Sequence, residues 1–256
     1  MNRIDTLFKT KQTNILSVYF TAGFPNLDDT IKIILQLEKL GVDLIEIGMP
    51  YSDPLADGPV IQKSSHTAIE NGMSLKKLFN QLKEIRKQTN IPLVLMGYLN
   101  TIINFGKENF CEHCDKVGID GVILPDLPLF EYKKDYKKLF SKTKLYPIFL
   151  VTPETDEYRL KQIVKESKGF IYVVSSSTTT GNKLEFNHKQ KEYFNRVKKA
   201  TKKPLMVGFG INNKKTFNEV CNYANGAIVG TQYIKELSTE NNIEKATQKF
   251  VKEFLL

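Results

Sequence analysis

The chain has 256 residues, of which 41% are hydrophobic and 25% are charged, and these values are ordinary for a globular protein. Its formal net charge is +9, but the lysines are spread along helical patterns without an arginine-rich patch, so we expect no nucleic-acid partner. Three cysteines, no signal-like N-terminus and no apolar run near the ~20 residues of a membrane span predict a cytoplasmic protein without a disulfide framework or membrane contact.

Short apolar strands alternate with helical patterns along the whole chain. A short helix at 4–8 precedes the first strand, and eight strands are predicted at 15–21, 43–47, 92–96, 121–124, 145–151, 170–174, 205–207 and 227–229. The clearest helix follows Ser74, because apolar residues recur there with the period of a helix at Leu75, Leu78, Phe79, Leu82 and Ile85.

Eight strand-then-helix units predict a parallel sheet closed into a (β/α)8 barrel, with an extra N-terminal helix and a single domain over residues 1–256. A doubly wound open sheet is the alternative, although such sheets commonly use five or six strands. In a barrel, chemistry belongs at the carboxyl ends of the strands. The unusual residues of the chain fall there, including Glu46, Asp57, Tyr98 and Asp126.

The segment around which the chain is organised runs from the second strand into a long loop and reads EIGMPYSDPLADGP from Glu46 to Pro59. Strand alternation places Leu44 and Glu46 on one face and Ile45 on the other. If helices cover the face of Ile45, Glu46 points into the barrel, where desolvation raises the pKa of a carboxyl and suits it to acid–base catalysis. The alternative is a structural Glu satisfied by a core Lys or Tyr.

Glycines follow the last two strands, as Gly208-Phe209-Gly210 and Gly230-Thr231. Barrels often bind phosphate at these two turns through backbone N–H groups, and Gly181 in the loop after the sixth strand could add a third wall. The alternative is that the glycines only form tight turns.

The sequence lacks the residue patterns of a zinc site, a hydrolase triad and a dinucleotide-binding site. Cys111-Glu112-His113-Cys114 resembles half of a zinc site, but no second cysteine pair has ligand spacing. His66 and His188 have no nucleophile elbow beside them, and Gly208-Phe209-Gly210 lacks the remaining residues of a dinucleotide fingerprint. We therefore expect neither a metal nor a cofactor in this chain.

Six segments resemble one family in order along the chain. They read TAGFP at 21–25, IEIGMPYSDPLADGP at 45–59, MGYLN at 96–100, GVILPDLP at 121–128, GFGI at 208–211 and GAIVGT at 226–231. By these motifs the chain resembles the tryptophan synthase alpha subunit. The resemblance implies retro-aldol cleavage of indole-3-glycerol phosphate to indole and glyceraldehyde 3-phosphate. It also implies an alpha2beta2 complex with a PLP-dependent beta subunit, which receives indole through a tunnel.

The resemblance also assigns roles to single residues. The catalytic acids fall on Glu46, as general acid and base, and Asp57, which would hold the indole N–H. The indole pocket would comprise Tyr19, Met96, Ile123, Tyr172 and Phe209. Phosphate would lie on the amides of Gly181, Gly210, Gly230 and Thr231, and Thr180 would close a loop near Asp57. The residues facing the partner would be Asp53, Pro54, Asn100, Asn104, Asp126 and Pro128.

The chain departs from the family pattern at several positions, and two alternatives to the implied function remain open. Ser176 and Thr178 replace a basic residue and a glycine common in relatives, Thr231 replaces a serine, and Phe24 stands where an acid is often found. The altered loop motivates one alternative, an activity-poor subunit that chiefly binds and activates its partner. The other is a phosphosugar isomerase or lyase on the same barrel, acting on substrates without an indole ring.

Overall fold

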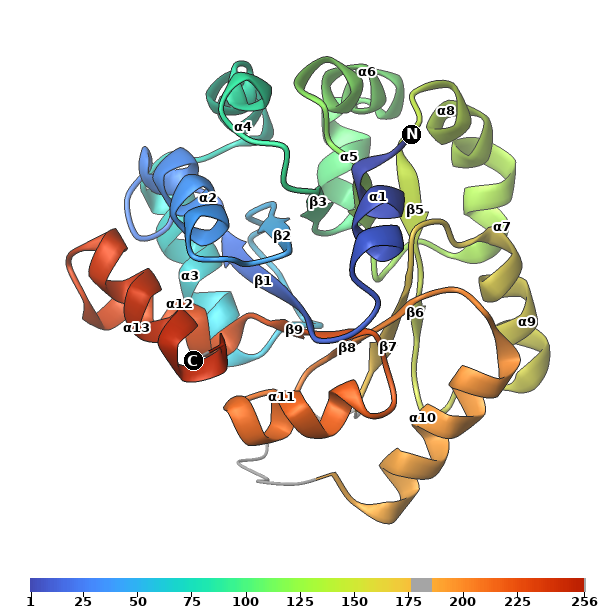
Figure 1. The fold of residues 1–256 in the computed structure, drawn as a ribbon. Coiled ribbons are helices and arrows are strands. Elements are labelled where there is room, and N and C mark those ends of the chain that lie inside the picture. Colours follow the sequence, from blue (N-terminus) through green and yellow to red (C-terminus); the bar gives the residue numbers. More distant parts are fainter. Residues whose placement is uncertain (176–185, 256) are drawn as a thin grey trace.

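A computed structural model describes residues 1–175 and 186–255 of the chain. Its strands form one parallel sheet that curves into a nearly closed barrel (Figure 1). The strands are β1 (Ile15–Thr21), β2 (Leu44–Gly48), β3 (Leu93–Met96), β4 (Gly121–Ile123), β5 (Tyr146–Ile148), β6 (Leu150–Val151), β7 (Ile171–Val174), β8 (Leu205–Gly208) and β9 (Gly226–Val229). Their order in the sheet is β5-β4-β3-β2-β1-β9-β8-β7-β6, which confirms the predicted barrel.

The predicted fifth strand is divided into β5 and β6 by the single residue Phe149. There the backbone N–H donates to the Ser167 hydroxyl (3.1 Å), and the ring packs against Tyr132 with centroids 5.0 Å apart. β5 pairs with β4 and β6 pairs with β7, so the two ends of the sheet meet at Phe149. The nine strands are thus the eight predicted units, and the open-sheet alternative is wrong.

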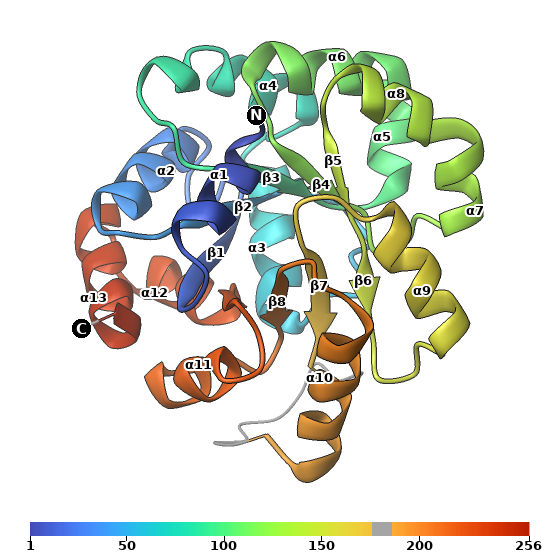
Figure 2. The ribbon, with the colours of Figure 1, turned by 45° about the vertical axis from the view of Figure 1, so that its right-hand side comes forward.

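Helices surround the barrel on all sides (Figure 2). They are α1 (Arg3–Thr10), α2 (Asp29–Lys39), α3 (Pro59–Glu70), α4 (Leu75–Leu82), α5 (Leu99–Phe105), α6 (Lys107–Val117), α7 (Leu129–Glu131), α8 (Lys137–Lys142), α9 (Glu157–Glu166), α10 (His188–Ala200), α11 (Lys214–Cys221), α12 (Thr231–Thr239) and α13 (Ile243–Leu255), with a 3₁₀ turn η1 (Ile85–Lys87) and a π-helical segment η2 (Tyr132–Tyr136). Three of them were not predicted from the sequence, α3, α5 and α12, and all three begin near the carboxyl ends of strands. None of the helices in the described ranges is both long and apolar enough to cross a membrane.

The side chains of the strands alternate between two apolar cores, one outside the barrel and one inside it. The outward residues, such as Ile45 and Ile47 of β2, pack under the helices in a large outer core. Leu44 of the same strand belongs to a smaller core inside the barrel, together with Val94, Ile123, Ile148, Met206 and Ile228. Since Glu46 alternates with Ile45 and Ile47, its side chain points inward, as predicted.

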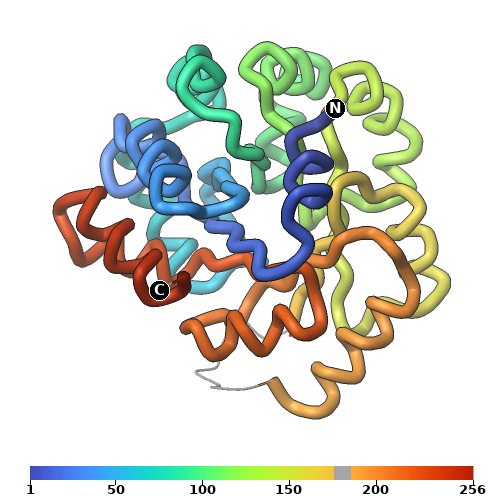
Figure 3. The backbone as a smooth tube through the Cα atoms, in the orientation of Figure 1, coloured from blue at the N-terminus to red at the C-terminus, as the bar shows by residue number. Residues whose placement is uncertain are grey.

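Helix α1 closes the amino-terminal end of the barrel (Figures 1 and 3). Ile4 is fully buried in the inner core, and the Arg3 guanidinium pairs with the buried carboxylate of Asp120 at 3.0 Å. Asp120 also accepts from Arg86 at 2.7 Å and from the Leu93 amide at 3.0 Å. These bonds fix α1 beneath the strands, so a substrate must enter from the opposite, carboxyl-terminal end.

Candidate active site

Glu46 is a fully buried carboxyl inside the barrel. In register it lies between Tyr19 of β1 and Val94 of β3. Its Oε1 accepts from the Ser17 hydroxyl at 3.1 Å, and within residues 1–175 and 186–255 its Oε2 has no hydrogen-bond partner. Burial raises the pKa of Glu46 to about 8, and the Ser17 hydrogen bond opposes this shift only in part. At neutral pH most of this carboxyl therefore holds its proton.

The predicted alternative for Glu46, a carboxylate satisfied by a core Lys or Tyr, does not match this environment. Its hydrogen-bond donor is a serine, and no charge within hydrogen-bonding distance favours ionisation in the part of the chain that the structure describes. A buried carboxyl with one free oxygen is suited to exchanging a proton with a bound molecule.

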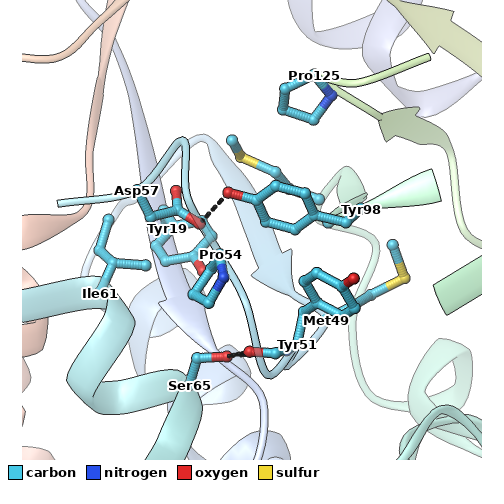
Figure 4. Close-up of a pocket in the computed structure, with 11 residues that line it drawn as sticks. Tyr19, Met49, Tyr51, Pro54, Asp57, Ile61, Ser65, Tyr98 and Pro125 are labelled. Carbon is cyan, nitrogen blue, oxygen red and sulfur yellow. Dashed lines mark hydrogen bonds between the residues drawn. The ribbon is translucent and has the colours of Figure 1, made fainter. Parts of the chain in front are cut away.

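Asp57 lies in the loop between β2 and α3, at the carboxyl-terminal mouth of the barrel (Figure 4). Its Oδ2 accepts from the Tyr98 hydroxyl at 3.0 Å, and its backbone carbonyl accepts from Gln62 of α3 at 2.9 Å. Burial raises the pKa of Asp57 to about 6, while the Tyr98 hydrogen bond lowers it. Asp57 is therefore mostly ionised at neutral pH, in contrast to Glu46.

A pocket opens beside Asp57 (Figure 4). Its walls come from β1 and β3, from the loops after β2, β3 and β4, and from α3. They are formed by Tyr19, Met49, Tyr51, Pro54, Asp57, Ile61, Ser65, Met96, Gly97, Tyr98 and Pro125. The lining is mostly aromatic and apolar, with a single carboxylate. Such a wall suits a flat aromatic group that offers one N–H donor.

The residues predicted to hold indole all lie on or directly after inward-facing strand positions. Ile123, Tyr172, Met96 and Phe209 belong to or pack against the inner core, and Tyr19 faces the same interior from β1. Burial is the first cause that raises the pKa of Tyr19 and of Tyr172, and the charges of both Glu46 and Asp57 raise these two pKa values further. The structure thus brings this predicted set together inside the barrel, where Tyr19 and Tyr172 respond to the charges of both acids.

Two strand-end glycines make room for the tyrosines. A Cβ atom at Gly48 would lie 2.2 Å from the Tyr19 hydroxyl oxygen, and one at Gly208 would lie 2.1 Å from that of Tyr172. Both distances are far shorter than a van der Waals contact. The tyrosine side chains can therefore cross the barrel mouth only because these positions carry no side chain.

The predicted phosphate residues lie only partly within the described residues. Gly210, with φ of +73°, and Gly230 and Thr231 at the start of α12 lie at the two turns expected for phosphate. The first N–H groups of α12 have no partner inside the helix and carry its positive dipole end. Gly181 and Thr180, together with the departures Ser176 and Thr178, lie outside the described residues.

Five of the six residues expected to face a partner are exposed, namely Asp53, Asn100, Asn104, Asp126 and Pro128. Pro54, the sixth residue, is buried in this structure and lines the pocket. Nearby loops and helices also expose large apolar side chains that sequence reasoning missed: Leu55 (88% exposed), Ile103 (54%) and Phe130 (70%). All three could have been found from the sequence, because each is a large apolar residue within two positions of a residue predicted to face the partner.

Sequence reasoning missed Ser17 and did not assign a role to Tyr98, although both bond the proposed acids. Ser17 could have been found from strand alternation, since it precedes Tyr19 by two residues on the same face. Cys111 and Cys114 are both buried in α6, and among the described residues no group of three or more His, Cys, Asp or Glu side chains could hold a metal ion.

A parallel (β/α)8 barrel with one buried carboxyl inside it and a second at its carboxyl-terminal mouth, their pKa values pushed apart, is the kind of arrangement that acid–base enzymes use. The family model described as tryptophan synthase alpha chain matches residues 6–255. The tryptophan synthase alpha chain of Flavobacterium psychrophilum is 52% identical over 254 residues, covering 99% of each chain. The chain therefore belongs to the tryptophan synthase alpha chain family. It is a lyase of tryptophan biosynthesis that cleaves indole-3-glycerol phosphate.

Solved structures show the same likeness. The crystal structure of the tryptophan synthase alpha chain from Legionella pneumophila subsp. pneumophila has a TM-score of 0.89 at 33% identity, covering 99% of this chain and 95% of that one. A chain in the crystal structure of the tryptophan synthase complex from Pyrococcus furiosus has a TM-score of 0.87 at 32% identity, covering 96% of this chain and 99% of that one.

Proposed function

We propose that Glu46 is the general acid and base of the cleavage and that Asp57 holds the indole N–H. The observation that carries this assignment is the difference between their environments. Burial without a nearby positive charge keeps Glu46 protonated near neutrality, with a pKa of about 8, whereas Asp57 ionises at about 6. Two carboxyls whose pKa values are pushed apart can take opposite roles in one reaction.

Each proton in the reaction then has a donor and an acceptor. Glu46 gives its proton to C3 of the indole ring, and the positive charge that develops at the ring nitrogen is stabilised by the carboxylate of Asp57. The Glu46 carboxylate next removes the proton from the glycerol hydroxyl as the carbon–carbon bond breaks. Indole and glyceraldehyde 3-phosphate are released, and Glu46 is again protonated.

The substrate would extend from the barrel interior to the last two turns. We place the indole ring among Tyr19, Met96, Ile123, Tyr172 and Phe209, which face the barrel interior. The phosphate would bind the amides of Gly210, Gly230 and Thr231 and, from the segment outside the described residues, Gly181, with Thr180 closing near Asp57. The apolar lining and the free N–H groups of α12 support this orientation.

We also propose that the chain, a single domain over residues 1–256 in the cytoplasm, forms an alpha2beta2 complex. Its partner would be a beta subunit that carries PLP and receives indole through a tunnel, while this chain needs no cofactor. The complex of the Pyrococcus furiosus relative supports such a partner. The contact would be formed by the six predicted interface residues and by three exposed apolar side chains: Asp53, Pro54, Asn100, Asn104, Asp126, Pro128, Leu55, Ile103 and Phe130.

Incubation with indole-3-glycerol phosphate tests the proposed function. The isolated chain should release indole, and addition of a beta subunit should increase the rate, because partner binding can complete the loops around Asp57. Indole is measured in both reactions, with a phosphosugar lacking the indole ring as the control substrate. Indole formation in neither reaction would favour the activity-poor subunit, and turnover of the control substrate alone would favour another phosphosugar enzyme.

The rate should depend on pH as a bell-shaped curve. Below a pH of about 6 Asp57 gains a proton and loses the charge that stabilises the ring, and above about 8 Glu46 loses the proton that it must donate. We therefore expect kcat/KM to be largest between these values. The profile of Asp57→Asn should lack the acidic limb and keep the alkaline one. A wild-type profile that stays flat across both values would contradict the assignment.

A further inference from the structure

The Tyr98 hydroxyl forms two hydrogen bonds to the loop that carries Asp57. It donates to Asp57 Oδ2 at 3.0 Å (Figure 4). It also accepts from the backbone N–H of Ala56 at 2.9 Å. One oxygen atom from the turn after β3 therefore fixes both the side chain of Asp57 and the backbone immediately before it. In a loop without regular structure, such a bond restricts the directions in which the carboxylate can point.

Tyr98 is itself held in two ways, through the backbone beside it and through its ring. The next residue, Leu99, begins α5, and its backbone N–H donates to both carboxylate oxygens of Asp126 at 2.9 and 3.0 Å. On the other side the ring stacks on Tyr51, with centroids 5.1 Å apart and planes inclined by 26°. The backbone of Tyr51 exchanges two hydrogen bonds with the Ser65 hydroxyl of α3, each 2.9 Å long.

Within the described residues, three titratable side chains from three elements bond Asp57 or respond to its charge. Tyr98 follows β3 and bonds the carboxylate directly, whereas Tyr19 of β1 and Tyr172 of β7 respond to its charge from inside the barrel. Burial raises the pKa of Tyr98, and so does the charge of Asp57, so the Tyr98 hydroxyl stays protonated and remains a donor at neutral pH. A donor to the ionised form stabilises the charge of Asp57.

We propose that Tyr98 is a positioning residue for Asp57, whose Oδ2 it holds so that Oδ1 is turned toward the indole N–H. This inference rests on the proposed role of Asp57 and adds a second residue to the site. Tyr98 does not touch the reacting atoms in this arrangement. It acts through the orientation and the ionisation of the carboxylate.

A double-mutant cycle of Tyr98→Phe, Asp57→Asn and both together tests this proposal on the full chain with indole-3-glycerol phosphate. Phenylalanine keeps the ring and its stacking on Tyr51. Tyr98→Phe should lower kcat/KM by about tenfold at neutral pH, mostly through kcat, which corresponds to the loss of one hydrogen bond to a charged group. The doubly substituted chain should be no slower than Asp57→Asn, because Tyr98 then has no carboxylate to orient.

The pH profile gives a readout that a merely structural role would not change. Without the Tyr98 hydroxyl the pKa of Asp57 should rise, so the acidic limb of the profile moves to higher pH while the alkaline limb stays. Tyr146→Phe is the matched control, because the Tyr146 hydroxyl donates to Asp5 at 2.6 Å at the opposite end of the barrel. It removes the same kind of bond and should leave both the rate and the profile unchanged.

Two outcomes would overturn the inference alone: wild-type rate and profile in Tyr98→Phe, or a loss that adds fully to that of Asp57→Asn. The first shows that the bond is not used, and the second shows that Tyr98 acts independently of Asp57. Wild-type activity in Asp57→Asn would instead overturn the proposed function, and with it this inference. Circular dichroism of each variant verifies that the barrel is folded.

Discussion

Substitution of Glu46 by glutamine should abolish indole formation and leave the barrel folded. The amide has nearly the shape of the carboxyl and can still accept from Ser17, whose bond to Glu46 is 3.1 Å long. It cannot give a proton to C3 of indole or take one from the glycerol hydroxyl. Since one group performs both transfers in the proposed mechanism, we expect kcat to fall by about 10³-fold or more.

Indole release by Glu46→Gln is compared with that by Glu112→Gln, which makes the same change on an exposed position of α6. The control should retain the wild-type rate. Near-normal turnover by Glu46→Gln would rule out its role as the acid and base. Substrate affinity should change little, because the side chain keeps its volume, so the loss should appear in kcat rather than in KM.

The stability of the same variant gives an independent measurement. The pKa of Glu46 is about 8 in the folded chain and 4.5 as an ordinary value. Between these values the folded chain binds one proton more than the unfolded chain, so the stability contributed by this group is full below the lower value and is lost as pH rises through the higher one. Glutamine does not titrate, so at alkaline pH Glu46→Gln should be more stable than the wild-type chain by about 2 kcal/mol or more.

The strands could be predicted because each is a short, mostly apolar run, and strand alternation, together with helices over the face of Ile45, placed Glu46 in the interior. Helix α3 was missed for a physical reason, since the residues it buries include Ser64 and Ser65, which bond Thr21 and Tyr51 instead of forming an apolar stripe. The division of the fifth strand was also hidden. There the Phe149 amide bonds the hydroxyl of Ser167, which lies 18 residues further along the chain at the end of α9, and the strand pattern does not reveal such a contact.

The candidate site, too, could be predicted from the sequence only in part. Glu46 and Asp57 could be named from the loop sequence and its resemblance to a family, because both lie in one contiguous motif. The hydrogen-bond partner of Asp57 could not be predicted, since Tyr98 follows a different strand, β3. The contact depends on the register of β2 with β3 and on the path of two loops. The burial of Pro54 has the same origin, because the loop folds back over the pocket.

Substitution of Asp57 by asparagine should lower kcat by about 10²-fold, a smaller loss than that of Glu46→Gln. Asparagine can still accept the indole N–H through its carbonyl oxygen, but it carries no charge to stabilise the positive ring. Asp57→Ala, which lacks both properties, should be slower than Asp57→Asn. Single-turnover indole release compares the two variants, with the exposed Asp115→Asn on α6 as the matched control.

The difference between the two Asp57 variants separates charge from hydrogen bonding. If only the hydrogen bond mattered, Asp57→Asn would be as fast as the wild-type chain, whereas equal losses in both variants would assign the whole effect to charge. The geometry favours a contribution from each. Tyr98 bonds Oδ2 of the Asp57 carboxylate at 3.0 Å. The negative charge of Asp57 should also interact strongly with the positive ring, because the surrounding aromatic and apolar side chains screen it far less than water would.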